Sequence, residues 1–431
     1  MVRASSHVVV GAPEHARTRT VGRAPALRSP RHRLSIESST CQRSAPVVDP
    51  RAMTNSQDLS FSRWLEPITE RVLQGGSVTR EEALKMLSAA GADSFTLFAG
   101  ANRIRETFQG TDVHLCSIVN AKSGRCSEDC GFCSQSVHFE SAIPEYPLVG
   151  ADEVVAHAEA AKARGSQALG IVAAWKGLRK GRQLDEVLDR IRKVAAVEGI
   201  HADASLGLID DPEIPPLLKD AGLVTYNHNL ETSRRFFGNV CETHSYDERI
   251  RTLQLLKAEG LHTCSGGIFG MGEEPEDRVD LALELKELDV DVIPLNFLNP
   301  MEGTPMEGRP LLAPMDCLRT IAMFRFVHPT KEIMVAGGRE VNLRDLQPLM
   351  FVAGASATMA GHYLTSSGRS TTDDWQMIRD LEMDYRPPGA DRPPGEAELL
   401  NRAAGNSASE AAPATSISKG VRFPVLDAAD L

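Results

Sequence analysis

Three cysteines crowd into one short segment with the spacing C-x3-C-x2-C: Cys126, Cys130 and Cys133. Structural zinc sites use four ligands, usually as two separated pairs. Three thiolates on a four-iron cluster would instead leave one iron open to a cofactor or substrate. Gly124 and Gly131 suit a loop that turns tightly around a bulky group. The segment therefore predicts an iron–sulfur centre with an open iron, and a zinc loop completed by a distant Cys or His is the alternative.

The composition is that of a water-soluble globular protein. The chain has 431 residues, of which 42% are hydrophobic and 24% are charged. Its eight cysteines are too sparse for a disulfide scaffold. No apolar run is long enough for a membrane span, and a net charge of −11 argues against a nucleic-acid partner. We therefore expect a cytoplasmic protein without nucleic-acid or membrane partners.

The two ends of the chain differ from the rest. The first 52 residues contain nine arginines, no lysine and three acidic residues. Such a composition is typical of transit peptides, but we favour a disordered extension over residues 1–55, or a true start at Met53. The chain becomes rich in Pro, Ala, Ser and Glu from Pro387, which predicts a disordered tail over 387–431.

Between the ends, short apolar runs alternate with longer amphipathic stretches. Residues 56–111 are predicted to form a helical lead-in, with one helix opened by Thr79-Arg80-Glu81-Glu82. Residues 112–386 contain eight strand–helix units, which predicts an α/β fold, a (β/α)8 TIM-type barrel; a doubly wound open sheet would give a similar pattern. The expected strands are 114–119, 168–173, 202–206, 223–228, 262–268, 290–297, 332–337 and 357–361.

Polar residues and a cysteine stand where several of these runs end. In a barrel, the carboxyl ends of the strands build the active site. The residues expected to converge there are Asn227, His228, Asn229, Cys264, Asn296 and Arg339.

The cysteine motif after the first strand resembles the signature of radical S-adenosylmethionine enzymes. Within that superfamily, residues 120–136 (NAKSGRCSEDCGFCSQS) resemble biotin synthase. Further segments resemble motifs of that family in the same order: AAWK (173–176), YNHNLET (226–232), CSGGIFGMGE (264–273), GTP (303–305) and GGRE (337–340).

The resemblance implies a sulfurtransferase that inserts sulfur between C6 and C9 of dethiobiotin. It implies a [4Fe–4S] cluster on the three motif cysteines, with S-adenosylmethionine on the open iron as the source of a 5′-deoxyadenosyl radical. A homodimer and an electron donor such as flavodoxin or ferredoxin are also implied. The family often has Asp at position 231, where this chain has Glu. The positions implied to bind cofactor or substrate are Asn229, Glu231, Gly270 and Asn296.

The pattern breaks at the family's second cluster, a [2Fe–2S] cluster held by three cysteines and one arginine. Cys264 and Arg339 match two of these ligands, and the resemblance makes them catalytic as well. Gly170 and Asp203 stand at the other two positions. Glycine offers no ligand, and Asp offers a harder oxygen. An ordinary [2Fe–2S] site is therefore in doubt.

Three interpretations follow. The first is sulfur insertion with an auxiliary cluster of different composition, held by Cys264, Arg339, Asp203 and further sulfide or thiol ligands. The second is a related enzyme that acts on another small substrate without sulfur insertion, and the third makes Cys264 a core residue. We favour the first, because the substrate-facing positions are retained. A non-catalytic zinc-binding barrel is the interpretation from another class.

The remaining cysteines and two histidines are expected to have lesser roles. Cys116 should point into the barrel below the site, Cys241 should lie on the helix side, and Cys317 should pack within a helix. None of the three is expected to be a ligand. His228 is expected at the rim near the cofactor, and His138 on a surface loop.

Overall fold

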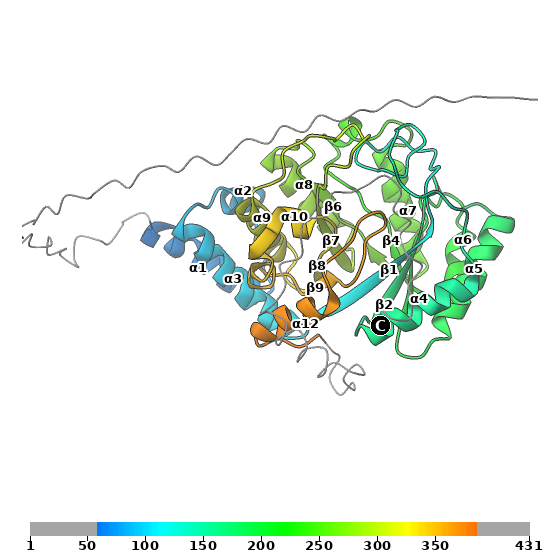
Figure 1. Cartoon of the computed structure of the whole chain (residues 1–431). Helices are drawn as coiled ribbons and strands as arrows, with labels where there is room; N and C mark the ends of the chain where they lie inside the picture. Colours follow the sequence, from blue (N-terminus) through cyan, green and yellow to red (C-terminus); the bar gives the residue numbers. More distant parts are fainter. Residues whose placement is uncertain (1–57, 386–431) are drawn as a thin grey trace, which may run out of the picture. The chain divides into compact units, whose positions relative to one another are not determined.

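The computed structural model describes residues 58–385, so the expectations for residues 1–55 and 387–431 lie outside the described range. Parallel strands form one closed sheet with helices around it (Figure 1). The strand order is β5-β4-β3-β2-β1-β9-β8-β7-β6, and a pairing between β5 and β7 closes the barrel. The strands are β1 (His114–Lys122), β2 (Ala168–Ala173), β3 (His201–Ser205), β4 (Leu223–Asn227), β5 (His262–Cys264), β6 (Gly267–Phe269), β7 (Val292–Phe297), β8 (Glu332–Val335) and β9 (Ala357–Met359).

The fifth expected strand is split into β5 and β6 by Ser265 and Gly266. The backbone passes so close to β7 at this point that a Cβ on Gly266 would lie 1.9 Å from the carbonyl oxygen of Pro294. Only glycine fits such an approach. The two short strands share one position in the barrel, and the predicted (β/α)8 architecture is confirmed.

Three helices precede the barrel: α1 (Asp58–Leu73), α2 (Arg80–Leu87) and α3 (Ala92–Gln109). The start of α2 is a capping box, since Thr79 and Glu82 each accept a hydrogen bond from the backbone of the other. The remaining helices are α4 (Ala151–Ala163), α5 (Arg182–Ala195), α6 (Ile214–Asp220), α7 (Tyr246–Ala258), α8 (Pro275–Glu287), α9 (Pro314–Val327), α10 (Arg339–Leu343), α11 (Leu349–Val352) and α12 (Thr371–Asp380), with 3-10 turns η1 (Phe237–Asn239) and η2 (Arg344–Leu346).

Helix α9 lies between the barrel and the lead-in helices. It contacts β8 on one side and both α2 and α3 on the other (Figure 1). From Cys317 to Val327, every residue except Arg319 is buried. The buried guanidinium of Arg325 donates to the carbonyl oxygens of Gly354 and Lys331, each at 2.8 Å. The lead-in helices thus cover the apolar face of α9 that points away from the barrel.

The strands present alternate side chains to the barrel interior. In β1, residues of intermediate exposure alternate with buried ones, and the former include His114, Cys116 and Ile118. All three line the central cavity, as the period of two in a strand requires.

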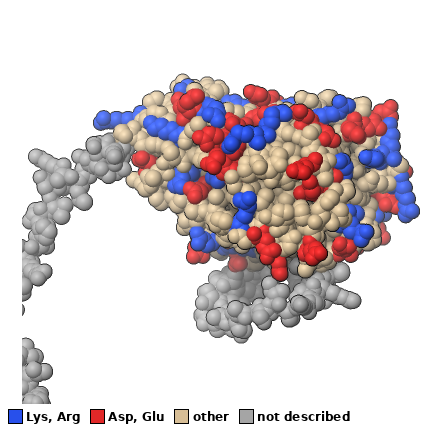
Figure 2. Space-filling model, turned by 90° about the horizontal axis from the view of Figure 1, so that it is seen from above, with Lys and Arg blue, Asp and Glu red and all other residues tan. Residues whose placement is uncertain are grey.

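On the face shown in Figure 2, acidic and basic side chains are interspersed. Between residues 58 and 385, no helix combines the length and the apolar character needed to cross a bilayer.

Candidate functional site

A cavity of about 490 Å³ lies inside the barrel, a size typical of small-molecule sites. Two groups of side chains line it. The mouth group lies at or after the carboxyl ends of the strands and comprises Cys126, Cys130, Cys133, Asn229, Glu231 and, in the last two residues of β7, Asn296. The floor group lies on the strands themselves and comprises His114, Cys116, Asp203, Cys264 and Glu332.

The cysteine loop of the mouth is tied to itself by backbone hydrogen bonds. The amide of Cys126 donates to the carbonyl oxygen of Gln135 at 2.9 Å. Gly124 has φ +73, and a Cβ there would lie 2.7 Å from Cγ of Glu145, so the turn into the loop requires glycine. Gly131 shows neither a positive φ nor a close approach. The expectation of a tight glycine turn therefore holds at position 124 and is wrong at position 131.

The three motif cysteines are free thiols that line one cavity. Burial raises the pKa of Cys126 and raises that of Cys133 to about 11. These thiols are therefore protonated at neutral pH until a metal displaces their protons. Three thiols in one loop fit a [4Fe–4S] cluster with one iron left open.

Glu231 is held beside this loop in a strained conformation. Its φ is +70, which is uncommon for a residue with a side chain. Its backbone N–H donates to the carbonyl oxygen of Gly266 at 3.1 Å, and Asn229 Oδ1 accepts from the amide of the same glycine at 3.2 Å. Burial raises the pKa of Glu231, while Arg249, whose Nη1 lies 3.3 Å away, favours the carboxylate. These bonds fix both side chains at the mouth.

Asn296 on β7 is fixed by two hydrogen bonds. Its Oδ1 accepts from the amide of Gly337 at 2.8 Å, and its Nδ2 donates to the carbonyl oxygen of Gly267 at 3.2 Å. His228 lines the cavity as expected, and burial lowers its pKa. His138 is exposed on the loop, with Nε2 3.0 Å from the Ser127 carbonyl oxygen, also as expected.

Two expected site residues are absent from the cavity lining. Arg339 is buried at the start of α10, where its Nη2 lies 2.6 Å from Oδ2 of Asp374 and its Nη1 donates to Gln347. Two of its three guanidinium nitrogens are thus paired with residues outside the cavity lining, and Nε is buried without a hydrogen-bond partner among the described residues. Gly270 has φ +99 and donates its N–H to Glu273 at 2.9 Å. It forms a tight turn beside the cavity.

The floor is a cluster of ionisable side chains from four strands. His114 Nδ1 lies 2.8 Å from Oε2 of Glu332, while Nε2 of this histidine and Oε1 of this glutamate are buried without a hydrogen-bond partner among the described residues. Asn227 Nδ2 donates to Sγ of Cys264 at 3.1 Å. Cys116 and Cys264 interact electrostatically with each other and with Asp203 and Glu332. Unpartnered buried nitrogen and oxygen atoms beside two thiols are what a metal-containing group would satisfy.

Gly170 and Asp203 face each other in the register of β2 and β3. A Cβ on Gly170 would lie 3.1 Å from Cγ2 of Ile118, so the space of the missing cysteine is filled by a β1 side chain. Asp203 Oδ1 accepts from the amide of Thr225 at 3.1 Å, and burial raises the pKa of Asp203 to about 7. The residues present do not fit a [2Fe–2S] cluster held by three cysteines.

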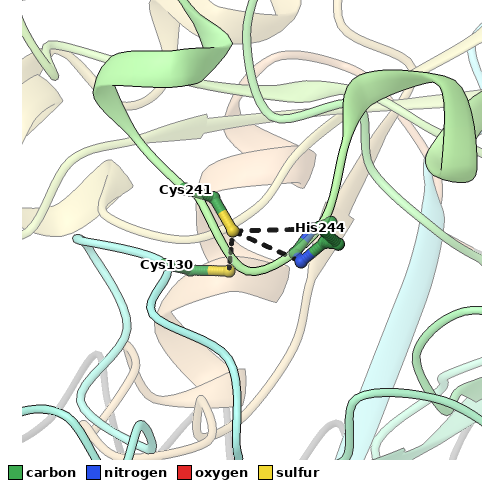
Figure 3. Close-up of side chains that lie close together, drawn as sticks. All are labelled: Cys130, Cys241 and His244. Carbon is green, nitrogen blue, oxygen red and sulfur yellow. Dashed lines mark hydrogen bonds between the residues drawn. The ribbon is translucent and has the colours of Figure 1, made fainter.

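Sequence reasoning missed a second layer around the mouth. Cys241 was expected on the helix side, but its Sγ lies 3.8 Å from Sγ of Cys130 (Figure 3). His244, three residues further on, lies 3.3 Å from this sulfur. Arg249 on α7 reaches both Cys130 and Glu231. Only the Cys-x2-His spacing of residues 241 and 244 signalled this layer in the sequence.

Comparison with known proteins places these features in a family. Residues 121–285 match the model of the Radical SAM superfamily, and residues 294–384 match that of the Biotin and Thiamin Synthesis associated domain. Biotin synthase of Geobacter metallireducens is 50% identical over 75% of this chain and 98% of its own length. That of Geobacter sulfurreducens is 49% identical over 74% and 97%. The chain belongs to the biotin synthase family.

Family membership makes the protein a radical S-adenosylmethionine enzyme of the sulfurtransferase type, with a [4Fe–4S] cluster and S-adenosylmethionine as cofactors. Among solved structures, methylornithine synthase has a TM-score of 0.66 at 18% identity and covers 77% of this chain and 100% of its own. The [FeFe]-hydrogenase maturase HydG has a TM-score of 0.64 at 17% identity, over 76% and 77%. At such identities these two support the barrel fold alone.

Proposed function

We propose that the protein converts dethiobiotin to biotin by inserting sulfur between C6 and C9. The observation that carries this proposal is that the open-iron cysteine loop lines one cavity with Asn229, Asn296 and Glu231, of which Glu231 keeps the carboxylate of the family's usual Asp. Its relatives at about half identity bear the name biotin synthase. One chamber then serves both hydrogen abstraction and sulfur transfer.

Each mouth residue has a role that its surroundings support. A [4Fe–4S] cluster on Cys126, Cys130 and Cys133 would supply the electron that cleaves S-adenosylmethionine. Asn229 and Glu231 would hold the cofactor ribose and the substrate, because hydrogen bonds and strain already fix their orientation. Asn296 would face dethiobiotin.

The floor would hold an auxiliary iron–sulfur cluster of a composition other than an ordinary [2Fe–2S]. The proposed ligands are Cys116 and Cys264, with Asp203 and the His114–Glu332 pair as further donors. Iron accepts thiolate, imidazole and carboxylate, and two of these donor atoms are otherwise unpartnered. Cys116, which sequence reasoning did not count as a ligand, replaces Arg339 in this set. The Asn227–Cys264 hydrogen bond would orient the second thiolate.

Iron and sulfide counts after anaerobic reconstitution test the floor. Cys116→Ala and Cys264→Ala should each lose the iron of the auxiliary cluster and keep the four irons of the mouth. Cys317→Ala is the matched control, because Cys317 is buried in α9 and absent from the cavity lining. Full iron content in both floor variants would refute the ligand set.

The decisive assay combines reconstituted protein, dethiobiotin, S-adenosylmethionine and a reductant. We expect 5′-deoxyadenosine and biotin, both dependent on dethiobiotin. Formation of 5′-deoxyadenosine that does not depend on dethiobiotin would favour a related enzyme with another substrate. The observation that favours this second candidate is that Gly170 and Asp203 stand where the family has two cysteine ligands. A colourless protein with one zinc and no EPR signal after reduction would identify a non-catalytic barrel.

The proposal includes a cytoplasmic homodimer that receives electrons from flavodoxin or ferredoxin. These three points rest on resemblance to the family. Size-exclusion chromatography with light scattering and reduction by each purified donor would test the dimer and the donor.

A further inference from the structure

Cys130 differs from the other two motif cysteines in its surroundings. Its Sγ lies 3.8 Å from Sγ of Cys241 and 3.8 Å from Nη2 of Arg249. The sulfurs of Cys126 and Cys133 have backbone groups as hydrogen-bond neighbours, and no side-chain donor to either is found between residues 58 and 385. Cys241, which precedes α7, and Arg249, which lies within it, therefore both contact the sulfur of Cys130.

The segment that carries Cys241 is anchored to the cysteine loop. The amide of Gly131 donates to the carbonyl oxygen of Val240 at 2.8 Å, and the amides of Glu242 and Thr243 donate to Oδ1 of Asp129 at 3.0 and 3.1 Å. Cys241 is buried beneath these contacts. Its position beside Cys130 is thus fixed by backbone bonds on both sides of the thiol.

The neighbouring histidine has one consistent tautomer. His244 Nδ1 lies 2.6 Å from Oε2 of Glu128, so it donates its proton to this carboxylate. Its Nε2 accepts from Nε of Arg249 at 2.9 Å. The neutral ring therefore connects the cysteine loop to Arg249 and holds Nη2 of this arginine toward Cys130.

We propose that the thiol of Cys241 donates a hydrogen bond to the Cys130 thiolate and thereby raises the reduction potential of the [4Fe–4S] cluster. A cysteine bound to iron has lost its proton, so only Cys241 can donate between these two sulfurs (Figure 3). Oδ1 of Asp129 lies 3.1 Å from the same thiol, but it already accepts hydrogen bonds from two amides and the Thr243 hydroxyl. The Cys130 thiolate has Arg249 as its other side-chain donor among residues 58–385. Hydrogen bonds to cluster sulfurs stabilise the reduced, more negative state. Cys241 is a positioning and tuning residue that acts through Cys130. The inference rests on the proposed assignment of the cluster to the mouth.

The test uses the reconstituted full chain in three variants: Cys241→Ala, Cys241→Ser and the control Cys317→Ala. Iron and sulfide counts and the change of the EPR signal on adding S-adenosylmethionine come first, because failure of these in the unaltered protein refutes the cluster assignment itself. An EPR-monitored redox titration then measures the midpoint potential of the mouth cluster. Arg249 is unsuitable for this test, since it also contacts Glu231.

We expect Cys241→Ala to bind a full cluster whose ratio of reduced to oxidised form falls about tenfold at a given potential, a shift of about 59 mV to more negative values for one electron. Cys241→Ser, which retains an O–H donor, should fall between Cys241→Ala and the unaltered protein, and the control should not shift. An unshifted Ala variant would overturn the proposal, as would a Ser variant shifted as far as Ala. Loss of iron from the mouth in Cys241→Ala would instead make Cys241 a ligand and overturn it too.

Discussion

The mouth and the floor of one cavity are built in opposite ways. The mouth takes its three sulfurs from a single loop, and a neighbouring segment braces one of them. The floor collects its donors from β1, β3, β5 and β8, one or two side chains at a time. A loop motif can be retained as a unit, whereas a site spread over four strands can change one ligand at a time. The departures at Gly170 and Asp203 both fall in the second kind of site.

The largest expected effect distinguishes the role of the floor from that of the mouth by the products that are formed. Cys264→Ala should reduce biotin formation at least 100-fold while 5′-deoxyadenosine is still produced, because sulfur supply fails and radical generation does not. Both products are measured by chromatography after a single turnover. Cys130→Ala is the counterpart and should abolish both products. Unchanged biotin yield in Cys264→Ala would remove the floor from the reaction.

A second comparison concerns Arg339, which lies beyond the carboxyl end of β8 and outside the cavity lining. Arg339→Gln should lower the free energy of unfolding of the metal-free protein by about 3 kcal/mol, since it removes the 2.6 Å partner of the buried Asp374 and leaves only Arg369, 3.8 Å from Oδ1. Urea unfolding measures this loss. The double variant Arg339→Met with Asp374→Leu should recover most of the stability. Loss of floor iron without loss of stability would show that Arg339 is a ligand after all.

A third change tests whether the missing cysteine can be restored. Gly170→Cys should destabilise the metal-free protein by about 1–3 kcal/mol, because its Cβ meets Ile118 at 3.1 Å. Ile118→Ala removes the opposing Cγ2, so in a double-mutant cycle Gly170→Cys should cost less stability in the Ile118→Ala background, as measured by urea unfolding. If Gly170→Cys alone is as stable as the parent, β1 and β2 separate more easily than the register suggests.

The effect that is smallest within any one pH unit is a pH dependence of the floor. Burial raises the pKa of Asp203 to about 7, whereas Asp in an unfolded chain ionises near pH ~4. From about pH 4 to about pH 7 the folded metal-free protein keeps a proton that the unfolded chain has lost. Its free energy of unfolding therefore falls as the pH rises, by up to about 1.4 kcal/mol per pH unit.

Asp203→Asn should remove this part of the slope in urea unfolding across that pH range. The exposed Asp220→Asn is the control and should leave the slope unchanged. An identical slope in Asp203→Asn and its parent would place the pH dependence elsewhere in the molecule.

The barrel and the mouth could be predicted because their signals are local. Apolar runs and the capping box at Thr79 mark elements where they occur, and the three motif cysteines are seven residues apart at most. The floor could be predicted only in part. Cys264 and Asp203 were expected at the second site and Cys116 inside the barrel below it, but nothing in the sequence places Glu332 opposite His114. The two-residue spacing of His114 and Cys116 indicates only that they share a strand face.

Residue type alone misled at two positions. Arg339 matched a family motif, but the motif does not say that its side chain turns toward Asp374 on α12. Cys241 was expected on the helix side because it lies well beyond β4 in the chain. The segment folds back onto the cysteine loop through the bond between Gly131 and Val240, a contact that depends on tertiary packing.

The enclosure of α9 has a consequence for how the molecule folds. A helix in the outer ring of a barrel usually has one solvent-exposed face. Helix α9 has no exposed face between Phe324 and Val327, where each residue is at most 1% exposed. Removing the segment before β1 would bare this apolar strip and invite self-association. We expect lead-in and barrel to unfold in one cooperative transition, so that a truncation starting at β1 would fail to give a well-behaved fragment.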